Sequence, residues 1–234
     1  DALGMSSNHY FADNGTKVGI DRLSTWMEAL GFGQPTGLKL YPPEASGIVP
    51  SREWKRNAFR DRPTSEQNWY PTDTEQISIG QGFHQMTLLQ LAQAYAAIAN
   101  RGQIYTPQIV KEIEAPDGTV VFRAEPELAR EIDVKPSTWD ALLEALRAPI
   151  THPRGTARGV MGDFPIPIAG KTGTWEVAGS ISNGLFVGFA PVDDPEILVA
   201  VIVEKGGGGS STATPIARKI FDAYFGLDGD GDAE

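Results

Sequence analysis

A polar tetrad, Lys-Thr-Gly-Thr at residues 171–174, lies between two apolar runs and limits how this chain can fold. Residues 166–170 come directly before it, and residues 184–190 follow after a short polar connection. Two such runs joined in this way predict an antiparallel hairpin, with the tetrad at the end of its first strand. A strand edge offers unpaired N–H groups to an extended ligand. Because Lys171 adds a positive charge, the tetrad predicts a site for an extended, anionic, peptide-like molecule.

Composition narrows the class of protein. With 234 residues, 41% of them apolar and 21% charged, the chain can bury a full core as one domain or a large piece of one. The net charge of −10 argues against a nucleic-acid partner. There is no cysteine, and the three histidines lack ligand spacing, so we expect no metal and no cofactor. No run of eighteen apolar residues or signal peptide is present, so we expect no membrane-spanning helix in this chain.

Apolar residues spaced three and four apart predict helices over residues 20–30, 88–100, 137–148 and 213–226. The second of these is apolar on most sides, so we expect it to be a buried central helix with Thr87 as its N-cap. In the first, we expect Asp21 as the N-cap and Trp26 on the face that packs into the core. In the last, the residues expected on the packed face are Ile216, Ile220, Phe221 and Tyr224.

Strand patterns complete the fold prediction. Residues 108–114 and 119–123 flank a Pro-Asp-Gly turn and predict a peripheral hairpin. The β-branched run from Ile197 to Val203 predicts a central strand that is buried on both faces. Residues 206–209 are four glycines and predict a flexible turn. The acidic tail, residues 227–234, is expected to be disordered.

A basic segment stands out in this acidic chain. Arginines and a lysine gather within residues 52–62, at positions Arg52, Lys55, Arg56, Arg60 and Arg62. One interpretation is an ordinary solvated face, and the other is a surface that holds an anionic glycan or peptide. The nearby Trp54, Trp69 and Tyr70 either anchor this long segment or face a substrate groove.

A second motif near the amino terminus narrows the class of protein that the tetrad indicates. Ser-Ser-Asn at residues 6–8, followed far downstream by Lys-Thr-Gly, forms two thirds of the signature of penicillin-binding proteins and serine β-lactamases. The missing third, Ser-x-x-Lys, carries the nucleophile, and no lysine of this chain has a serine three residues before it. The nearest approach to it, Thr36 followed by Lys39, lies in a Pro-Thr-Gly turn.

Further stretches occur in the same order as in one family. They are Gly-Ile-Asp-Arg-Leu (19–23), Gly-Phe-Gly (31–33), Pro-Thr-Gly (35–37), Arg-Glu-Trp-Lys (52–55), Ile-Gly-Gln-Gly (79–82) and Arg-Gly-Thr-Ala (154–157). With the two motifs above, residues 1–226 resemble the carboxy-terminal two thirds of the transpeptidase domain of class B penicillin-binding proteins, and most of all the elongation-specific members. β-Lactamases are less similar, because their interval between the two motifs is shorter.

The resemblance implies an α/β (α+β) fold: an antiparallel five-stranded sheet flanked by helices, plus a helical lobe, with the active site between them. It implies a peptidoglycan D,D-transpeptidase, in which a serine attacks the D-Ala-D-Ala amide of a stem peptide and an amine of a neighbouring strand resolves the acyl-enzyme. β-Lactam antibiotics mimic that dipeptide and acylate the same serine. Since the nucleophile segment is absent, we expect this chain alone to be inactive.

The resemblance also implies roles for residues of the two motifs. Ser6 would relay a proton towards the leaving amine, and Asn8 would hydrogen-bond the substrate amide and the general-base lysine. Lys171 would hold Ser6 and raise the local positive potential. Ser6 and Lys171 should therefore lie within hydrogen-bonding distance, roughly 3 Å.

The rest of the tetrad would bind substrate. The Thr172 and Thr174 hydroxyls would bind the terminal carboxylate, and the Thr174 N–H would supply one oxyanion-hole donor. Gly173 would let the ligand approach the backbone closely. Trp175 stands where the family has a small residue, and it would stack over the bound peptide, wall off water or pack against the following turn.

The implied partners are D-Ala-D-Ala stem peptides, β-lactams, a membrane glycosyltransferase and other cell-wall elongation proteins. The implied location is the periplasmic face of the cytoplasmic membrane, with an anchoring helix outside this chain. Two alternatives remain open: a catalytically silent scaffold of a cell-wall synthesis complex, and a β-lactam sensor domain.

Overall fold

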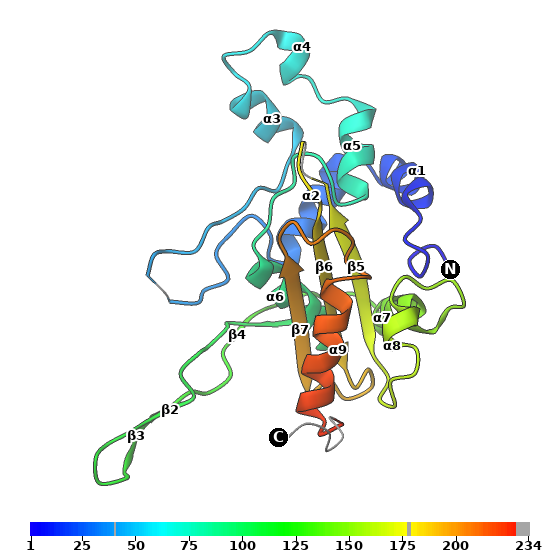
Figure 1. Cartoon of the computed structure of the whole chain (residues 1–234). Coiled ribbons are helices and arrows are strands. Elements are labelled where there is room, and N and C mark those ends of the chain that lie inside the picture. The colour runs from blue at the N-terminus through cyan, green and yellow to red at the C-terminus, as the bar shows by residue number, and fades with distance from the viewer. Residues whose placement is uncertain (40, 177–178, 228–234) are drawn as a thin grey trace.

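Helices surround a small antiparallel sheet, and exposed segments project from this body (Figure 1). The computed structural model describes residues 1–39, 41–176 and 179–227. Within them the helices are α1 (Asn8–Val18), α2 (Ile20–Ala29), α3 (Arg52–Ala58), α4 (Thr64–Gln67), α5 (Pro71–Ser78), α6 (Leu88–Ala99), α7 (Pro136–Thr151), α8 (Arg158–Met161) and α9 (Ala213–Tyr224). The strands are β1 (Gln103–Tyr105), β2 (Glu112–Glu114), β3 (Val120–Arg123), β4 (Leu128–Glu131), β5 (Ala169–Trp175), β6 (Asn183–Ala190) and β7 (Ile197–Val203).

The predicted helices form, with differences at their ends. Thr87 caps α6 as predicted, because its hydroxyl accepts a hydrogen bond from the Gln90 N–H at 3.1 Å. α2 begins at Ile20 with Gly19 as its N-cap, so the prediction that Asp21 caps it is wrong. α7 extends to Thr151, beyond the predicted end. Trp26 is exposed rather than buried. α1 was not predicted, since its sequence carries no apolar stripe.

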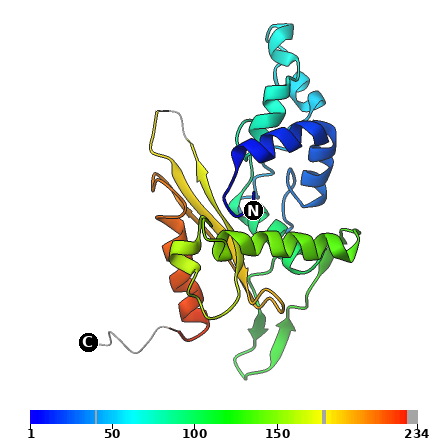
Figure 2. The same cartoon turned by 90° about the vertical axis from the view of Figure 1, so that its right-hand side faces the viewer.

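The tetrad hairpin is present as predicted. β5 and β6 pair antiparallel with Lys171 opposite Val187, and β6 pairs antiparallel with β7. β6 is the middle strand, and its two fully buried phenylalanines point to opposite faces. Phe189 packs with residues of α6 and α7, whereas Phe186 packs with residues of α8 and α9. The sheet is therefore covered on both faces, as Figure 2 shows.

Two expectations about this sheet need correction. In the described residues it has three strands, in the order β5-β6-β7, so the expected count of five is not met. β7 was predicted to be central, but it lies at an edge of this sheet, and Ile202 is 40% exposed. An apolar, β-branched run shows strand propensity and burial; it does not show which neighbours the strand pairs with.

The packed face of α9 also differs from the prediction. The buried residues are Ala213, Thr214, Ala217 and Phe221, so Phe221 is buried as predicted, whereas the predicted Ile216, Ile220 and Tyr224 are exposed. Small residues on the buried face let the helix lie close to β6 and β7. The predicted stripe was therefore displaced around the helix by about one residue, or roughly 100°.

A helical lobe of α1, α2 and α5 stands above the sheet (Figure 1). Gly15 in α1 faces Ser78 in α5 so closely that a Cβ atom on Gly15 would lie 2.5 Å from the Ser78 Cβ atom. The missing side chain therefore sets how near the two helices can approach. This contact positions the start of α1, where the Ser-Ser-Asn motif lies.

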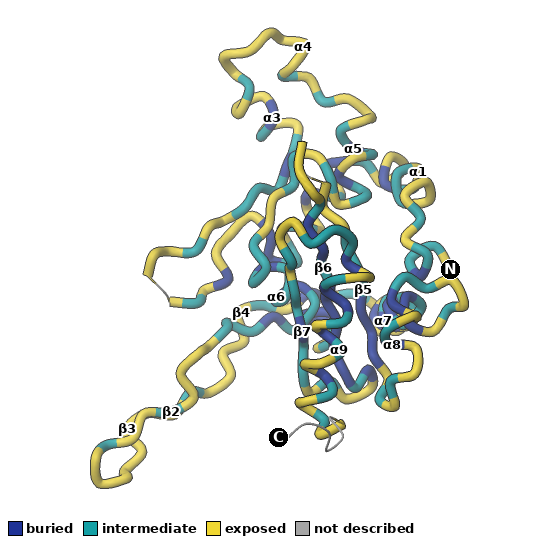
Figure 3. Tube along the Cα trace, in the orientation of Figure 1, coloured by how far each residue is buried: buried dark blue, intermediate teal, exposed yellow. Residues whose placement is uncertain are grey.

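The projecting segments include the arm that carries α3 and α4, and the β2–β3 hairpin. Both are largely exposed, as Figure 3 shows, and the hairpin lies at the periphery as predicted. The acidic tail predicted for residues 227–234 lies outside the described residues apart from Leu227. Among the described helices, none is both long enough and apolar enough to cross a membrane.

Candidate active site

A groove of about 580 Å³ lies between the start of α1 and the open edge of β5. The segments that form it are far apart in sequence and come from both the lobe and the sheet. They contribute Leu3, Ser6, Asn8, Phe11, Ser78, Ile79, Gln81, Thr156, Lys171, Thr172, Gly173, Thr174, Glu176 and Ser210. The groove therefore brings together six of the seven residues predicted for the site.

Ser6 occupies a strained turn immediately before α1. Its φ angle is 53°, in the left-handed region that residues with a Cβ atom seldom adopt, at a cost of about 1–3 kcal/mol. Local hydrogen bonds maintain this turn, including those from the Ser6 N–H to the Leu3 carbonyl and from the Ser7 N–H to the Ala2 carbonyl. The Ser7 hydroxyl caps α1. The two neighbouring serines therefore have different tasks: Ser7 starts the helix, and Ser6 faces the groove.

Lys171 joins the lobe to the sheet. Its Nζ atom donates hydrogen bonds to Ser6 Oγ at 2.9 Å and to the Thr172 carbonyl at 2.7 Å. The expected proximity of Ser6 and Lys171 is thus present in the structure. Burial lowers the pKa of Lys171 to about 8. Near neutral pH this amine can therefore both carry a charge and exchange a proton.

The open edge of β5 points its amides into the groove. The Thr174 carbonyl accepts a hydrogen bond from Gln81 Nε2 at 3.3 Å, so it faces away from β6. In an antiparallel strand the N–H and C=O of one residue point to the same side. The Thr174 N–H therefore also lies on the open edge, where an oxyanion-hole donor would have to be.

The tetrad hydroxyls already have protein partners. Thr172 Oγ1 donates to Thr156 Oγ1 at 2.7 Å, and Thr174 Oγ1 accepts from the Gly209 N–H at 3.4 Å. Since Thr174 Oγ1 acts as an acceptor there, its hydrogen remains able to donate to a ligand. These contacts hold both side chains in place before any ligand binds.

The glycine segment at residues 206–209 was predicted to be a flexible turn, but Gly209 is buried against the sheet. A Cβ atom on Gly209 would lie 2.2 Å from the Gly173 carbonyl oxygen, so only glycine fits there. Its own carbonyl accepts two hydrogen bonds from Thr214 at 2.9 Å. This segment therefore supports the wall of the groove beneath the tetrad.

Two predicted site residues lie at the margins. Asn8 is the first residue of α1 and lines the groove. Trp175 ends β5, is 55% exposed and is not among the lining residues. The Trp175 side chain, predicted to stack over a bound peptide, wall off water or pack against the following turn, is therefore largely exposed to solvent.

Sequence reasoning assigned no site role to several lining residues, notably Gln81, Thr156, Glu176 and Ser210. Gln81 and Thr156 belong to stretches that were singled out, Ile-Gly-Gln-Gly and Arg-Gly-Thr-Ala. That signal pointed to the segments but not to their place beside β5. Glu176 and Ser210 carried no signal of their own.

Comparisons with known proteins agree with this geometry. The profile of the family described as Penicillin binding protein transpeptidase domain matches residues 1–222. Peptidoglycan D,D-transpeptidase MrdA of Haemophilus influenzae is 38% identical over 241 aligned residues, which cover 96% of this chain and 36% of that protein. The chain therefore spans about a third of the length of this curated relative.

Solved structures give the same result. PBP2 of Pseudomonas aeruginosa, in complex with WCK 5153, matches with a TM-score of 0.82 and 40% identity, over 100% of this chain and 50% of that one. PBP2 of Helicobacter pylori, in its complex with MreC, matches with a TM-score of 0.80 and 27% identity, over 97% of this chain and 39% of that one. The resemblance inferred from the motifs is thus confirmed: this chain belongs to the family of penicillin-binding protein transpeptidase domains.

Proposed function

We propose that this chain forms part of a serine-type peptidoglycan D,D-transpeptidase that cross-links stem peptides and is a target of β-lactams. The observation that carries the proposal is the 2.9 Å contact between Lys171 Nζ and Ser6 Oγ beside the open edge of β5. A lysine of lowered pKa, a hydroxyl and free strand amides together suit acyl transfer to and from a peptide. The Haemophilus influenzae relative, named as a peptidoglycan D,D-transpeptidase, supports the same reaction.

The nucleophile would come from a Ser-x-x-Lys segment that is not among these 234 residues. That serine would lose its proton to the neighbouring lysine and attack the carbonyl carbon of the penultimate D-Ala. An ester bond forms, the amide C–N bond breaks, and terminal D-Ala leaves with a proton relayed through Ser6. The amine of a second stem peptide would then attack the ester, forming the cross-link and releasing the serine.

The remaining residues would position the substrate. Asn8 would hydrogen-bond the peptide amide, and the Thr174 N–H would stabilise the developing oxyanion, a contact worth roughly 3 kcal/mol. The Thr172 and Thr174 hydroxyls would bind the terminal carboxylate, attracted by the charge on Lys171. Gly173 leaves the strand backbone accessible, and Trp175 would cover the peptide from its exposed position.

We further propose that the full protein works on the periplasmic face of the cytoplasmic membrane, anchored outside this chain. Its partners would include a membrane glycosyltransferase and other cell-wall elongation proteins. The complex of Helicobacter pylori PBP2 with MreC supports a partner of that kind.

The test is labelling with a fluorescent penicillin, followed by a denaturing gel and intact mass analysis. The 234-residue chain should give no covalent adduct, whereas the same chain joined to the Ser-x-x-Lys segment of its own protein should label at that segment's serine. An adduct on Ser6 or another serine of this chain would show that the nucleophile is misassigned. No labelling of the longer protein would contradict the enzyme and favour a silent scaffold.

A further inference from the structure

A second groove, of about 360 Å³, lies on the arm that carries α3 and α4. This arm groove is lined by Arg52, Arg56, Gln67, Asn68, Trp69 and Tyr70. It shares no residue with the groove at Ser6 and Lys171. Its volume falls within the range of roughly 300–1,000 Å³ that is usual for small-molecule sites.

The arm groove presents positive charge in a chain whose net charge is −10. Arg52 and Arg56 lie one turn apart on α3, and both line the groove. Arg52 Nε lies 3.4 Å from Asp21 Oδ1 in an exposed ion pair, a kind of contact that contributes little to stability. Among the described residues, no carboxylate lies within ion-pair distance of Arg56. Both guanidinium groups can therefore turn to an anionic ligand.

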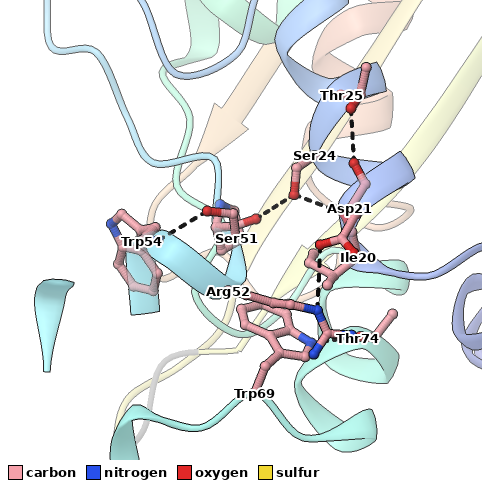
Figure 4. Close-up of polar contacts among 10 residues, drawn as sticks. Ile20, Asp21, Ser24, Thr25, Ser51, Arg52, Trp54, Trp69 and Thr74 are labelled. Atoms are coloured by element: carbon pink, nitrogen blue, oxygen red, sulfur yellow. Dashed lines mark hydrogen bonds and ion pairs between the residues drawn. The ribbon is translucent and has the colours of Figure 1, made fainter. Parts of the chain in front are cut away.

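The aromatic side of the arm groove is held rigidly. Trp69 Nε1 donates a hydrogen bond to Thr74 Oγ1 at 2.9 Å, as Figure 4 shows beside Arg52. The Tyr70 hydroxyl donates to the Ser65 carbonyl at 2.8 Å. Since both rings are fixed before any ligand arrives, binding to them would cost little conformational entropy.

A buried ion pair supports these rings from behind. Lys55 Nζ lies 2.6 Å from Asp73 Oδ2 and 5.3 Å from the centroid of the Tyr70 ring. The same Asp73 oxygen accepts a hydrogen bond from the Tyr70 N–H at 2.8 Å. Of the basic residues around the groove, Lys55 is therefore structural, whereas Arg52 and Arg56 are exposed towards solvent.

These side chains match the chemistry of a glycan that carries acidic peptides. Flat aromatic rings stack on the apolar faces of sugars, and the amide of Asn68 can pair with hydroxyl or acetamido groups. A guanidinium group binds a carboxylate through two parallel hydrogen bonds. A solvated basic face, the other interpretation of this segment, would need neither the groove nor the fixed rings.

We infer that the arm groove binds a peptide-bearing segment of the glycan strand outside the catalytic groove, with sugar faces on the aromatic rings and a stem-peptide carboxylate on the guanidinium groups. This inference rests on the proposed function, since peptidoglycan is the polymer on which that groove would act. α5 connects the two sites: Tyr70 caps its start, and Ser78 at its end lines the catalytic groove. Eight helical residues span roughly 12 Å, so one short oligosaccharide-peptide can reach both grooves.

The test is calorimetric titration of the chain with a soluble tetrasaccharide of alternating N-acetylglucosamine and N-acetylmuramic acid that carries stem peptides. Arg56→Ala should weaken binding about tenfold, the effect of one charge-assisted contact. Tyr70→Ala should weaken it through the lost ring. Arg62→Ala removes the same charge on the same arm outside the groove, so its affinity should stay within about twofold of the wild type.

Two comparisons identify the ligand. The free stem peptide and the tetrasaccharide without peptide should each bind more weakly than the intact compound. Equal affinity of the wild type and Arg56→Ala would overturn the inference. So would equal losses in Arg56→Ala and Arg62→Ala, which would indicate only a diffuse charge effect. Thermal unfolding of each variant checks that the fold is retained.

A separate titration distinguishes this inference from the proposed function. A diacetyl-Lys-D-Ala-D-Ala peptide should bind the catalytic groove, with a loss in Lys171→Ala and none in Arg56→Ala. If Arg56→Ala binds the tetrasaccharide-peptide as tightly as the wild type, while the tripeptide binds normally, only the inference about the arm groove is overturned. Wild-type protein that binds the tetrasaccharide-peptide through Arg56 but does not bind the tripeptide would contradict the proposed function instead.

Discussion

The amine of Lys171 lies 2.9 Å from the hydroxyl of Ser6, although 165 residues separate them in the sequence. One residue belongs to an edge strand and the other to the turn that starts the helical lobe. This contact joins the two halves of the fold across the catalytic groove. Changes that disturb either half should therefore be measurable at this pair.

The first prediction concerns the charge of Lys171. In the protein that carries the nucleophile segment, Lys171→Ala should slow acylation by penicillin at least about a hundredfold, because a charge-assisted contact in the groove is lost. Stopped-flow acylation kinetics measure the rate. Lys17→Ala, on the exposed side of α1, is the matched control and should acylate normally. A normal rate in Lys171→Ala would remove this residue from the site.

The second prediction concerns pH. Burial lowers the pKa of Lys171 from 10.5 to about 8, so its charge is present below pH 8 and is lost above it. Binding of a D-Ala-D-Ala peptide carboxylate should therefore weaken as pH rises through about 8. Titrations from pH 6.5 to 9.5 should show this inflection in the wild type. If the Lys171→Ala variant shows the same inflection, the pH dependence of peptide binding comes from the titration of another group.

The same shift has a consequence for stability. Between pH 8 and 10.5 the unfolded chain still binds the Lys171 proton, whereas the folded chain has released it. The contribution of Lys171 to the free energy of unfolding should therefore rise with pH across this window. Urea denaturation of the wild type and Lys171→Ala at pH 7.5 and 10 isolates the effect. A difference between the two proteins that does not change with pH would contradict it.

The third prediction concerns the contact between α1 and α5. Gly15→Ala should destabilise the fold by about 1–3 kcal/mol, because the added methyl group would lie 2.5 Å from the Ser78 Cβ atom. Ser78→Gly removes that atom, so the double variant should lose less than the sum of the two single losses. Urea denaturation of all four proteins measures this coupling. Strict additivity would show that the helices adjust without strain.

The fourth prediction compares two lysine–aspartate pairs of the same 2.6 Å length. The side chains of Lys55 and Asp73 are only 6% and 16% exposed, whereas those of Lys17 and Asp13 are 67% and 55% exposed. Asp73→Ala should cost about 3–5 kcal/mol, because it leaves a buried ammonium group without its partner. Asp13→Ala should leave the free energy of unfolding close to the wild-type value, because this pair is exposed to solvent. Similar losses in chemical denaturation would refute a structural role for the buried pair.

The local elements could be predicted from short stretches of sequence. The tetrad between two apolar runs specified the β5–β6 hairpin, and the pattern around Leu88–Ala99 specified α6 with its cap at Thr87. Each of these patterns spans a few consecutive residues, and the backbone hydrogen bonds of the resulting helix or hairpin form within the same segment. The ordered motifs also identified the family, because they fix residue types at the positions where the chemistry occurs.

How those elements meet could not be predicted in this way, because it depends on contacts between distant segments. The edge position of β7 and the exposure of Ile216 depend on partners that no local pattern names. The fixed place of Gly209, in the turn between β7 and α9, depends on contact with Gly173 on β5. Likewise, the position of Ser6 beside Lys171 and the lowered pKa of that lysine arise from packing the lobe against the sheet edge. The sequence names these groups, but burial and distance exist only once the chain has brought its distant segments together.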